Sequence, residues 1–525
     1  MSAGYTLQAY ERVISSPCPN RLGQGGIFLD KRKPIVYNAL LLTAVNLLLR
    51  FVSTSFQVYL SGRIGPQGIG LLQLVLSVGA LAMTAGMGGI RTATMYLCAE
   101  TAGQKKYQNM IWVLSACILY SVILSGTVGL ALYHFAPVIA EKWVGSTGTV
   151  GAIRLLACFL PVNCLCGVMV GYFTGISRIG TLAAVEVAEQ LFSMLITVVL
   201  LTVYAGTNPY KACLSVIMGS GLGACFTLCT LVICRRLEHS TQGARIPIFK
   251  RLCQVALPLA IADDVKAGIS TTENLMVPKR LALYPGEASP LAAFGMVCGM
   301  VFPVLMFPAA ILFGLAELLI PELARCNAAG SRRRIHYLTG RSLRLALIYG
   351  CLCGGILFLS AENLCGKLYS TPEAGRYLRW YALLAPMLYC DAIVDAMTKG
   401  LGQQKICVRY NIITSAMDVA LLFVLLPKYG MAGYFASFFI THLINFLLSI
   451  QLLQKLVGVA VSVKSTVLCP VAALGSVMAA GTVSSPWGRC FAFGILFFAL
   501  LVLLGVIGRH DLWWFKGLIR SRSID

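Results

Sequence analysis

The sequence predicts an all-α integral membrane protein, and three observations support this fold class. Of the 525 residues, 58% are hydrophobic and only 12% are charged, whereas soluble domains usually carry about 25% charged residues. Apolar segments of about 20 residues, the length that spans a bilayer as a helix, recur along the whole chain. Helices are expected rather than strands because each helix satisfies its own backbone hydrogen bonds in lipid.

Hydropathy windows predict about fourteen transmembrane helices. They begin near Ile35, Ile69, Ile111, Ile153, Leu182, Ala212, Leu252, Ala292, Leu343, Tyr377, Val408, Ala432, Thr466 and Phe491. Residues 1–34 are polar and lack the apolar core of a signal peptide, so we expect a cytoplasmic tail there.

The distribution of basic residues predicts the orientation. Most of the 42 Lys and Arg fall on one side if both termini are cytoplasmic. The net charge of +22 is then explained by cytoplasmic loops and anionic membrane lipid, so no nucleic-acid partner is expected.

Motifs for catalysis or metal binding are missing from the sequence. It has no P-loop, nucleophile elbow or zinc-protease motif, its five His are scattered, and its 20 Cys form no CxxC pair. The segments between helices are too short for a soluble catalytic domain. We therefore expect a protein that is not an enzyme and holds no metal or cofactor.

A basic segment, residues 236–251, is predicted to link two groups of six helices. The first group, residues 35–235, forms an N-lobe, and the second, residues 252–455, forms a C-lobe. Residues 456–510 supply helices 13 and 14, and residues 511–525 form a cytoplasmic tail. Because six is even, any internal repeat would be parallel. One chain would contain both lobes, so a monomer suffices.

The apolar segment LPLAIADDVKAGISTTENLMVP, residues 257–278, carries unexpected charges. On a helix, Asp263, Lys266, Glu273 and Asn274 share one face, while Asp264 lies off that face. Ionisable groups at mid-bilayer cost about 3 kcal/mol or more and so face a bundle interior or a water-filled cavity. The segment predicts either a hydrated path for a polar substrate or a salt bridge that fixes helix packing.

Further polar residues repeat this pattern. Asn46 and Arg50 share a face of the first helix, and Arg91 follows Gly86, Gly88 and Gly89 in the second. A cavity with these Arg residues and Lys266 would suit an anionic substrate, particularly a phosphate.

The second half also contains a group of oxygen ligands. Asp391, Asp395 and Lys399 form one stripe of the tenth helix, and Thr414 and Asp418 lie four residues apart on the eleventh. Together with Ser437, such oxygens suit Na⁺ or H⁺ as a coupling ion. Alternatively, Lys399 only neutralises Asp395.

Several segments resemble one family of membrane proteins. They are GIGLLQLVLSV (68–78), ENLMVPKRL (273–281), LLIPELA (318–324), DAMTKGLGQQ (395–404) and LLPKYGMAGY (425–434). With them, residues 35 to 510 resemble the stage V sporulation protein B group of polysaccharide exporters. This group belongs to the MOP flippase superfamily, with the MATE drug exporters and the lipid II flippases.

The resemblance implies a MOP/MATE-like fold, with two six-helix lobes around a central cavity plus two C-terminal helices. It also implies a site. Arg50 resembles a cavity arginine of the lipid II flippases, whereas Pro303 and Met306 stand where those proteins carry Arg and Glu, so Lys266 and Glu273 are expected to substitute. The cation site of some relatives would map to Asp263 or Asp264, Thr414, Asp418 and Ser437.

The hypothesis is a flippase in a bacterial cytoplasmic membrane that moves an undecaprenyl-pyrophosphate-linked saccharide, such as a peptidoglycan precursor, from the inner to the outer leaflet. Spore cortex or cell-envelope synthesis would use it, with cell-wall enzymes as possible partners. A cation-coupled multidrug exporter of the same fold is the main alternative. An integral-membrane glycosyltransferase and a non-transporting scaffold also remain open.

Overall fold

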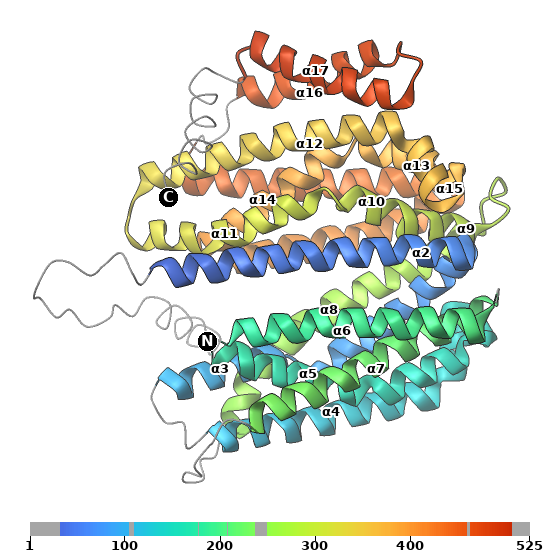
Figure 1. Cartoon of the computed structure of the whole chain (residues 1–525), viewed down its shortest axis with the longest axis vertical. Coiled ribbons are helices and arrows are strands. Elements are labelled where there is room, and N and C mark those ends of the chain that lie inside the picture. Colours follow the sequence, from blue (N-terminus) through green and yellow to red (C-terminus); the bar gives the residue numbers. More distant parts are fainter. Residues whose placement is uncertain are drawn as a thin grey trace, which may run out of the picture. The chain divides into compact units, whose positions relative to one another are not determined.

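The computed structural model describes residues 32–103, 110–176, 178–206, 208–236, 249–458 and 463–506, and all regular elements there are helices (Figure 1). The prediction of an all-α fold is confirmed. The first eleven elements with α labels in Figure 1 have these bounds: α2 Arg32–Met87, α3 Ile90–Gly103, α4 Met110–Val138, α5 Val150–Gly175, α6 Ile179–Leu200, α7 Pro209–Arg236, α8 Phe249–Leu281, α9 Pro290–Gly295, α10 Phe302–Met306, α11 Ala309–Ala328 and α12 Arg332–Tyr369. The others are α13 Pro372–Ala382, α14 Ala385–Gly400, α15 Gln404–Val457, α16 Val463–Ala480 and α17 Pro486–Leu503.

The described helices are consistent with the predicted number of membrane crossings. Eight are long and apolar enough to cross a bilayer, and two sharply bent pairs, α9–α10 with α11 and α13 with α14, raise this number to ten. Each of the two longest helices, α2 and α15, contains a break and provides two crossings. Adding the charged α8 and the shorter α16 gives fourteen within the described ranges.

Glycines produce the breaks in the two longest helices. A straight helix of 56 residues, the length of α2, would be about 84 Å long, far more than the roughly 30 Å of bilayer core. Gly65 interrupts α2 with φ 71° and ψ 174°, and Gly430 interrupts α15 with φ 57° and ψ −136°. These conformations favour glycine, and Pro66 directly after the first break removes a further helical hydrogen bond.

The chain divides into two compact units by its contacts, and each is described separately. The first contains Arg63–Lys279 together with the chain up to Phe56, and the second contains Gln57–Gly62 together with the chain from Arg280 onward. The segment Gln57–Gly62 of α2 is anchored within the second unit, because Gln57 Nε2 donates a hydrogen bond to the Gly299 carbonyl at 3.1 Å. The predicted linker between the N-lobe and the C-lobe, residues 236–251, lies at a different place in the chain from this division. The lobe boundaries remain a prediction.

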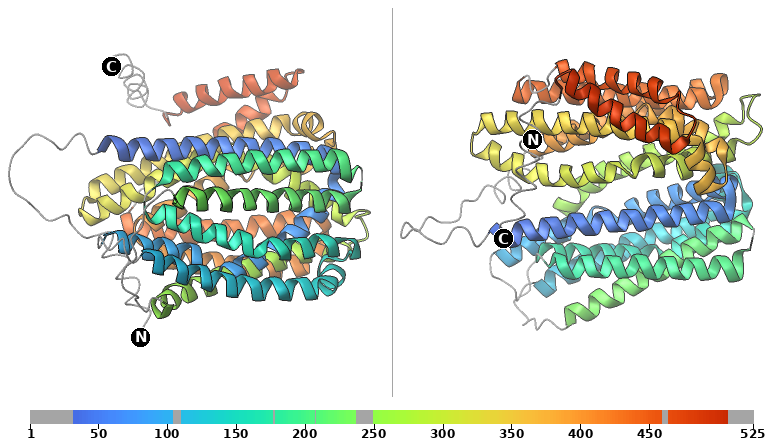
Figure 2. Two further views of the ribbon diagram at one scale, coloured as in Figure 1. Left: turned by 60° about the horizontal axis from the view of Figure 1, so that its bottom comes forward. Right: turned by 45° about the horizontal axis from the view of Figure 1, so that its top comes forward.

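The first unit has a core to which α3, α4, α5, α6, α7 and α8 contribute buried residues (Figures 1 and 2). Small residues let α5 approach α3 closely. A Cβ atom on Gly171 would lie 2.5 Å from the Arg91 carbonyl oxygen, and one on Gly175 would lie 2.7 Å from the Met95 oxygen. Close backbone approach through small residues is a main source of helix association in membranes. The seam therefore fixes the backbone of α3 at Arg91.

The second unit contains the C-terminal pair α16 and α17, which pack against α12 (Figure 2). Phe493 and Phe497 of α17 are fully buried there and their rings stack with centroids 5.6 Å apart. Gly355 of α12 makes room for this contact, because a Cβ atom on it would lie 2.1 Å from the Phe493 ring. The two helices after the predicted C-lobe are thus packed through an aromatic-glycine contact.

Candidate functional site

Helix α8, which carries the charged segment, packs within the first unit. A Cβ atom on Gly89 would lie 2.6 Å from the Ala256 carbonyl oxygen, so the backbones of α8 and the α2–α3 junction nearly touch. About four turns of α8 further on, Thr271 Oγ1 donates to the Ser77 carbonyl and Asn274 Nδ2 donates to Ser77 Oγ, both at 3.1 Å. These contacts place the polar face of α8 against α2.

The helix break between α2 and α3 shapes the site. Gly88 and Gly89 adopt φ values of 46° and 70°, a region that glycine enters at little cost. The Tyr120 hydroxyl of α4 donates to the Gly88 carbonyl at 3.1 Å and so satisfies a backbone group that the break frees. Two of the glycines that precede Arg91 in the sequence thus form a helix break, and Arg91 follows it at the start of α3.

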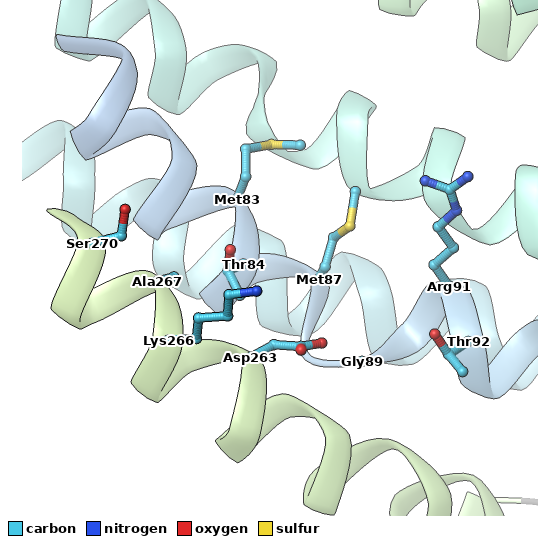
Figure 3. Close-up of a pocket in the computed structure, with 10 residues that line it drawn as sticks. All are labelled: Met83, Thr84, Met87, Gly89, Arg91, Thr92, Asp263, Lys266, Ala267 and Ser270. Atoms are coloured by element: carbon cyan, nitrogen blue, oxygen red, sulfur yellow. The ribbon is translucent and has the colours of Figure 1, made fainter. Parts of the chain in front are cut away.

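A cavity of about 460 Å³ lies between α8 and the α2–α3 junction (Figure 3). Its lining consists of Met83, Thr84, Met87, Gly89, Arg91, Thr92, Asp263, Lys266, Ala267 and Ser270. The cavity therefore combines two cationic side chains and one carboxylate with three hydroxyl groups and two thioethers. Helix α8 contributes four of these residues, and two of them, Asp263 and Lys266, belong to its predicted polar face.

The three charged side chains of the cavity are available to a ligand. Arg91, Asp263 and Lys266 are exposed, and none of them forms a hydrogen bond or ion pair with its side chain within the described part of the chain. The Asp263–Lys266 salt bridge that their spacing permits is therefore not formed in this state. In Figure 3 the guanidinium of Arg91 is directed away from α8, whereas Lys266 and Asp263 both extend from α8. The net charge of the lining is positive.

The other predicted substrate residues lie elsewhere. Asn274 is bonded to Ser77 and, like Glu273, does not line the cavity. Arg50 is half-buried and also outside the lining. The side chain of Asn46 lies outside the described residues. The structure thus brings together Arg91, Lys266 and Asp263 from the predicted set.

Asp264 lies off the polar face, as its wheel position suggests. Its Oδ1 atom is buried and has no hydrogen-bond partner among the described residues. A buried carboxylate oxygen without a hydrogen-bond partner is costly.

A hydroxyl-carboxylate cluster lies within α15 in the second unit. Ser437 Oγ donates to Asp418 Oδ1 at 2.6 Å, and Thr441 Oγ1 donates to the same oxygen at 3.2 Å. Thr414 is buried nearby along the helix but donates to the carbonyls of Tyr410 and Asn411 rather than to Asp418. Thr441 was not predicted, although it follows Ser437 by four residues on the same helix face.

The carboxylates on one face of α14, Asp391 and Asp395, each have a partner within the second unit. Lys399 Nζ lies 2.5 Å from Asp395 Oδ2, so the ion pair considered from the sequence is formed. Asp391 accepts a hydrogen bond from Asn445 Nδ2 of α15 at 3.2 Å. In the described segments, no three His, Cys, Asp or Glu side chains are grouped closely enough to hold a metal ion.

Two carboxylates of the first unit were not predicted as site residues from the sequence. Glu186 and Glu189 lie half-buried in the apolar helix α6, and Glu189 Oε2 accepts a hydrogen bond from Thr227 Oγ1 of α7 at 2.6 Å. The rule applied to α8, that charges within a transmembrane helix mark function, would have found them.

Comparisons with known proteins support the fold. No family model matches the chain. Stage V sporulation protein B of Bacillus subtilis (strain 168) is 22% identical over 476 residues, which cover 88% of this chain and 91% of that protein. The resemblance to this group is thereby confirmed.

Solved structures show the same architecture. The lipid II flippase MurJ in an inward closed conformation matches with a TM-score of 0.63 and 13% identity, over 90% of this chain and 99% of that chain. A multidrug resistance MATE family transporter of the MOP superfamily, inward-facing, matches with a TM-score of 0.62 and 12% identity, over 84% of this chain and 100% of that one. The chain is a multi-pass membrane protein with the fold of these transporters.

Proposed function

We propose that the protein is a flippase that carries an undecaprenyl-pyrophosphate-linked saccharide from the inner to the outer leaflet by alternating access. The observation that carries this proposal is the cavity between α8 and the α2–α3 junction, with Arg91 and Lys266 in its lining. Fold alone does not decide between substrates, so the proposal rests on the chemistry of this site.

The lining suits a pyrophosphate headgroup. Arg offers planar, paired donors to phosphate oxygens, and Lys offers a compact charge. The hydroxyl groups of Thr84, Thr92 and Ser270 can hydrogen-bond sugar or phosphate oxygens. A cavity of about 460 Å³ has room for the pyrophosphate and an adjoining sugar, while the isoprenoid tail stays in the bilayer. No step needs a catalytic group, so we assign no enzyme activity.

The similarity to MurJ and to stage V sporulation protein B agrees with this assignment. We place the protein in a bacterial cytoplasmic membrane with both termini inside, where it would serve spore cortex or cell-envelope synthesis beside cell-wall enzymes. A single chain contains both units, so a monomer suffices.

Reconstituted vesicles test the proposal. Purified protein is inserted into liposomes with fluorescent lipid II, and arrival in the opposite leaflet is followed with a membrane-impermeant quencher. We expect transport by the wild type and none in protein-free vesicles. Export of an organic cation without lipid II transport would contradict the proposal.

A coupling ion is proposed at Asp418. Its carboxylate and the hydroxyls of Ser437 and Thr441 provide hard oxygen ligands, and Thr414 of the same helix is a further candidate. We propose Na⁺ or H⁺ as the ion. No other cofactor is needed.

The Asp418→Asn variant is expected to lose stimulation of transport by an imposed Na⁺ or H⁺ gradient, because the neutral amide cannot balance the ion's charge. Transport with and without each gradient measures this. Glu362→Gln, which removes the same charge from a carboxylate bound to Arg379 at 3.2 Å, is the matched control. Full stimulation of the Asp418→Asn variant would rule out this site.

A cation-coupled multidrug exporter is the second candidate, because the MATE transporter structure matches nearly as well as the flippase. Asp263 and the thioethers of Met83 and Met87 would be its contacts to an organic cation. The two cations in the same lining oppose that ligand.

A further inference from the structure

The second unit carries a dense group of positive charges where α11 ends and α12 begins. Residues 325–344 contain six Arg and neither Asp nor Glu. Glu322 of α11 forms ion pairs with two of these Arg, at 2.6 Å with Arg334 and at 3.5 Å with Arg325. The side chain of Arg333 is exposed and forms no hydrogen bond or ion pair within the described ranges. Since one carboxylate faces several guanidinium groups, the group keeps a net positive charge.

Part of this group forms a stripe on the open side of α12. Arg333, Tyr337 and Arg341 follow one another at intervals of four residues, so they lie on one face of the helix, and Leu345 continues this face. The buried residues of the same turns lie on the opposite face; they are Ile335, Thr339, Ser342, Leu343 and Ala346. We call the four residues of the open face, Arg333, Tyr337, Arg341 and Leu345, the α12 stripe.

Contacts beside the stripe hold its second guanidinium in place. Arg341 Nη1 donates to the Tyr337 hydroxyl at 2.6 Å, and Arg341 Cζ lies 5.7 Å from the centroid of the Tyr337 ring. The hydroxyl is neutral, so this bond orients the guanidinium without cancelling its charge. Arg344, less than one turn further, donates to the carbonyl of Val506, just after the end of α17. The α12 stripe is therefore an ordered surface beside the end of α17.

The α12 stripe changes from charged to apolar along the helix axis, as a phospholipid does. Arg333 and Arg341 are eight residues apart, about 12 Å along a helix, whereas the polar headgroup layer of one leaflet is about 5–8 Å thick. Tyr is typical of this interface. Leu345 is 40% exposed and lies at the start of the apolar part of α12. A lipid phosphate at the Arg side chains would therefore place its acyl chains along Leu345.

Charge decides between two possible occupants of the stripe. Residues 507–525, which follow α17 in the chain, carry four Lys or Arg and two Asp, so their net charge is positive like that of the stripe. An anionic phospholipid complements the stripe, because Arg offers paired donors to phosphate oxygens. Clusters of basic residues beside a transmembrane helix are typical of binding to anionic lipid headgroups.

We propose that the α12 stripe binds one anionic phospholipid, whose phosphate contacts Arg333 and Arg341 and whose acyl chains contact Leu345. With both termini inside, as proposed above, this end of α12 lies at the cytoplasmic surface and the lipid belongs to that leaflet. The inference goes beyond the transport function, because this lipid is a ligand of the second unit that the protein does not carry.

Native mass spectrometry of the purified protein tests the binding. Phosphatidylglycerol, or zwitterionic phosphatidylcholine with the same acyl chains, is titrated against the protein in detergent. We expect tighter binding of phosphatidylglycerol. One basic side chain near a membrane surface contributes about fivefold in affinity, so Arg333→Gln should weaken it about fivefold, and Arg333→Gln combined with Arg341→Gln about thirtyfold.

Two variants serve as controls for this titration. Arg376→Gln removes the same charge from an exposed Arg of α13 in the same unit but far along the chain from the stripe, and it should bind phosphatidylglycerol like the wild type. Arg333→Lys keeps the charge and should retain most of the affinity. Because Arg333 has no side-chain partner among the described residues, its replacement leaves no other group unsatisfied.

Photo-crosslinking tests the location. The photoreactive residue p-benzoyl-phenylalanine is incorporated at Leu345, and the protein is irradiated in vesicles with equal amounts of phosphatidylglycerol and phosphatidylcholine. We expect an adduct with phosphatidylglycerol that Arg333→Gln reduces.

Four results would overturn the proposal: equal binding or crosslinking of the two lipids, wild-type affinity in the double variant, crosslinks to residues 507–525 in place of lipid, or loss of the lipid to millimolar inorganic phosphate, which would make the site one for free phosphate. None of these results depends on whether the protein moves lipid II.

Discussion

Replacing Lys266 by Ala is expected to reduce lipid II transport by about ten- to a hundredfold while leaving the protein folded. The ammonium is exposed in the cavity lining and has no side-chain partner in the described residues, so its removal leaves no buried charge behind. A hydrogen bond to a charged group contributes about 1.5–3 kcal/mol, which sets the size of the effect. Fluorescent lipid II in liposomes measures it.

Lys250→Ala is the control for this prediction. Lys250 is exposed on the same helix, near its start, and does not line the cavity. It should transport like the wild type. Transport at the wild-type rate by Lys266→Ala would show that the headgroup does not use this ammonium, and an equal loss in both variants would point to a general effect of charge on α8.

The Gly89→Ala variant is expected to destabilise the described state by about 2–5 kcal/mol. A non-glycine residue at φ 70° costs about 1–3 kcal/mol, and the added Cβ atom would lie 2.6 Å from the Ala256 carbonyl oxygen. Because this contact holds α8 beside the α2–α3 junction, the cavity should be lost with it. Thermal melting in detergent, together with farnesyl pyrophosphate binding, measures both effects.

Gly126→Ala is the matched variant. Gly126 lies in the helix α4 of the same unit, and a Cβ atom there would meet nothing within 4 Å. Alanine is the better helix former, so this variant should melt at the wild-type temperature or slightly above it. If the two variants melt alike, the close approach of α8 at Gly89 does not stabilise the protein.

The positions of the helices were predictable because the mean hydropathy of a window of about 20 residues is high wherever a helix crosses the membrane. The predicted start near Leu252 lies close to the observed Phe249, whereas that near Leu343 falls well inside a helix that begins at Arg332. Mean hydropathy detects only the apolar part of α12, so it does not detect the charged turns with which this helix begins. The breaks at Gly65 and Gly430 require φ values that only the structure reveals.

The site was predictable in part. The helical wheel placed Asp263 and Lys266 on one face, and both line the cavity. The helical wheel also placed Asn274 on this face, but Asn274 is hydrogen-bonded to Ser77 and does not line the cavity. A wheel gives the direction of a side chain around the helix, and it does not give the neighbouring helix at each height. Glu186 and Glu189 lie within an apolar segment, so the same rule that singles out the charges of residues 257–278 also identifies these two from the sequence.

The break at Gly65 has a mechanical consequence. The two halves of α2, before and after Gly65, are joined without an intervening loop. The turn at Gly65 therefore cannot extend, and a tilt of the first half must tilt the second half as well. The first half of α2 carries Arg50, and the second half ends at the α2–α3 junction, just before Arg91 in the chain. Lengthening this turn with a few flexible residues should let the two helices move separately, and transport would then become uncoupled from the movement of the first.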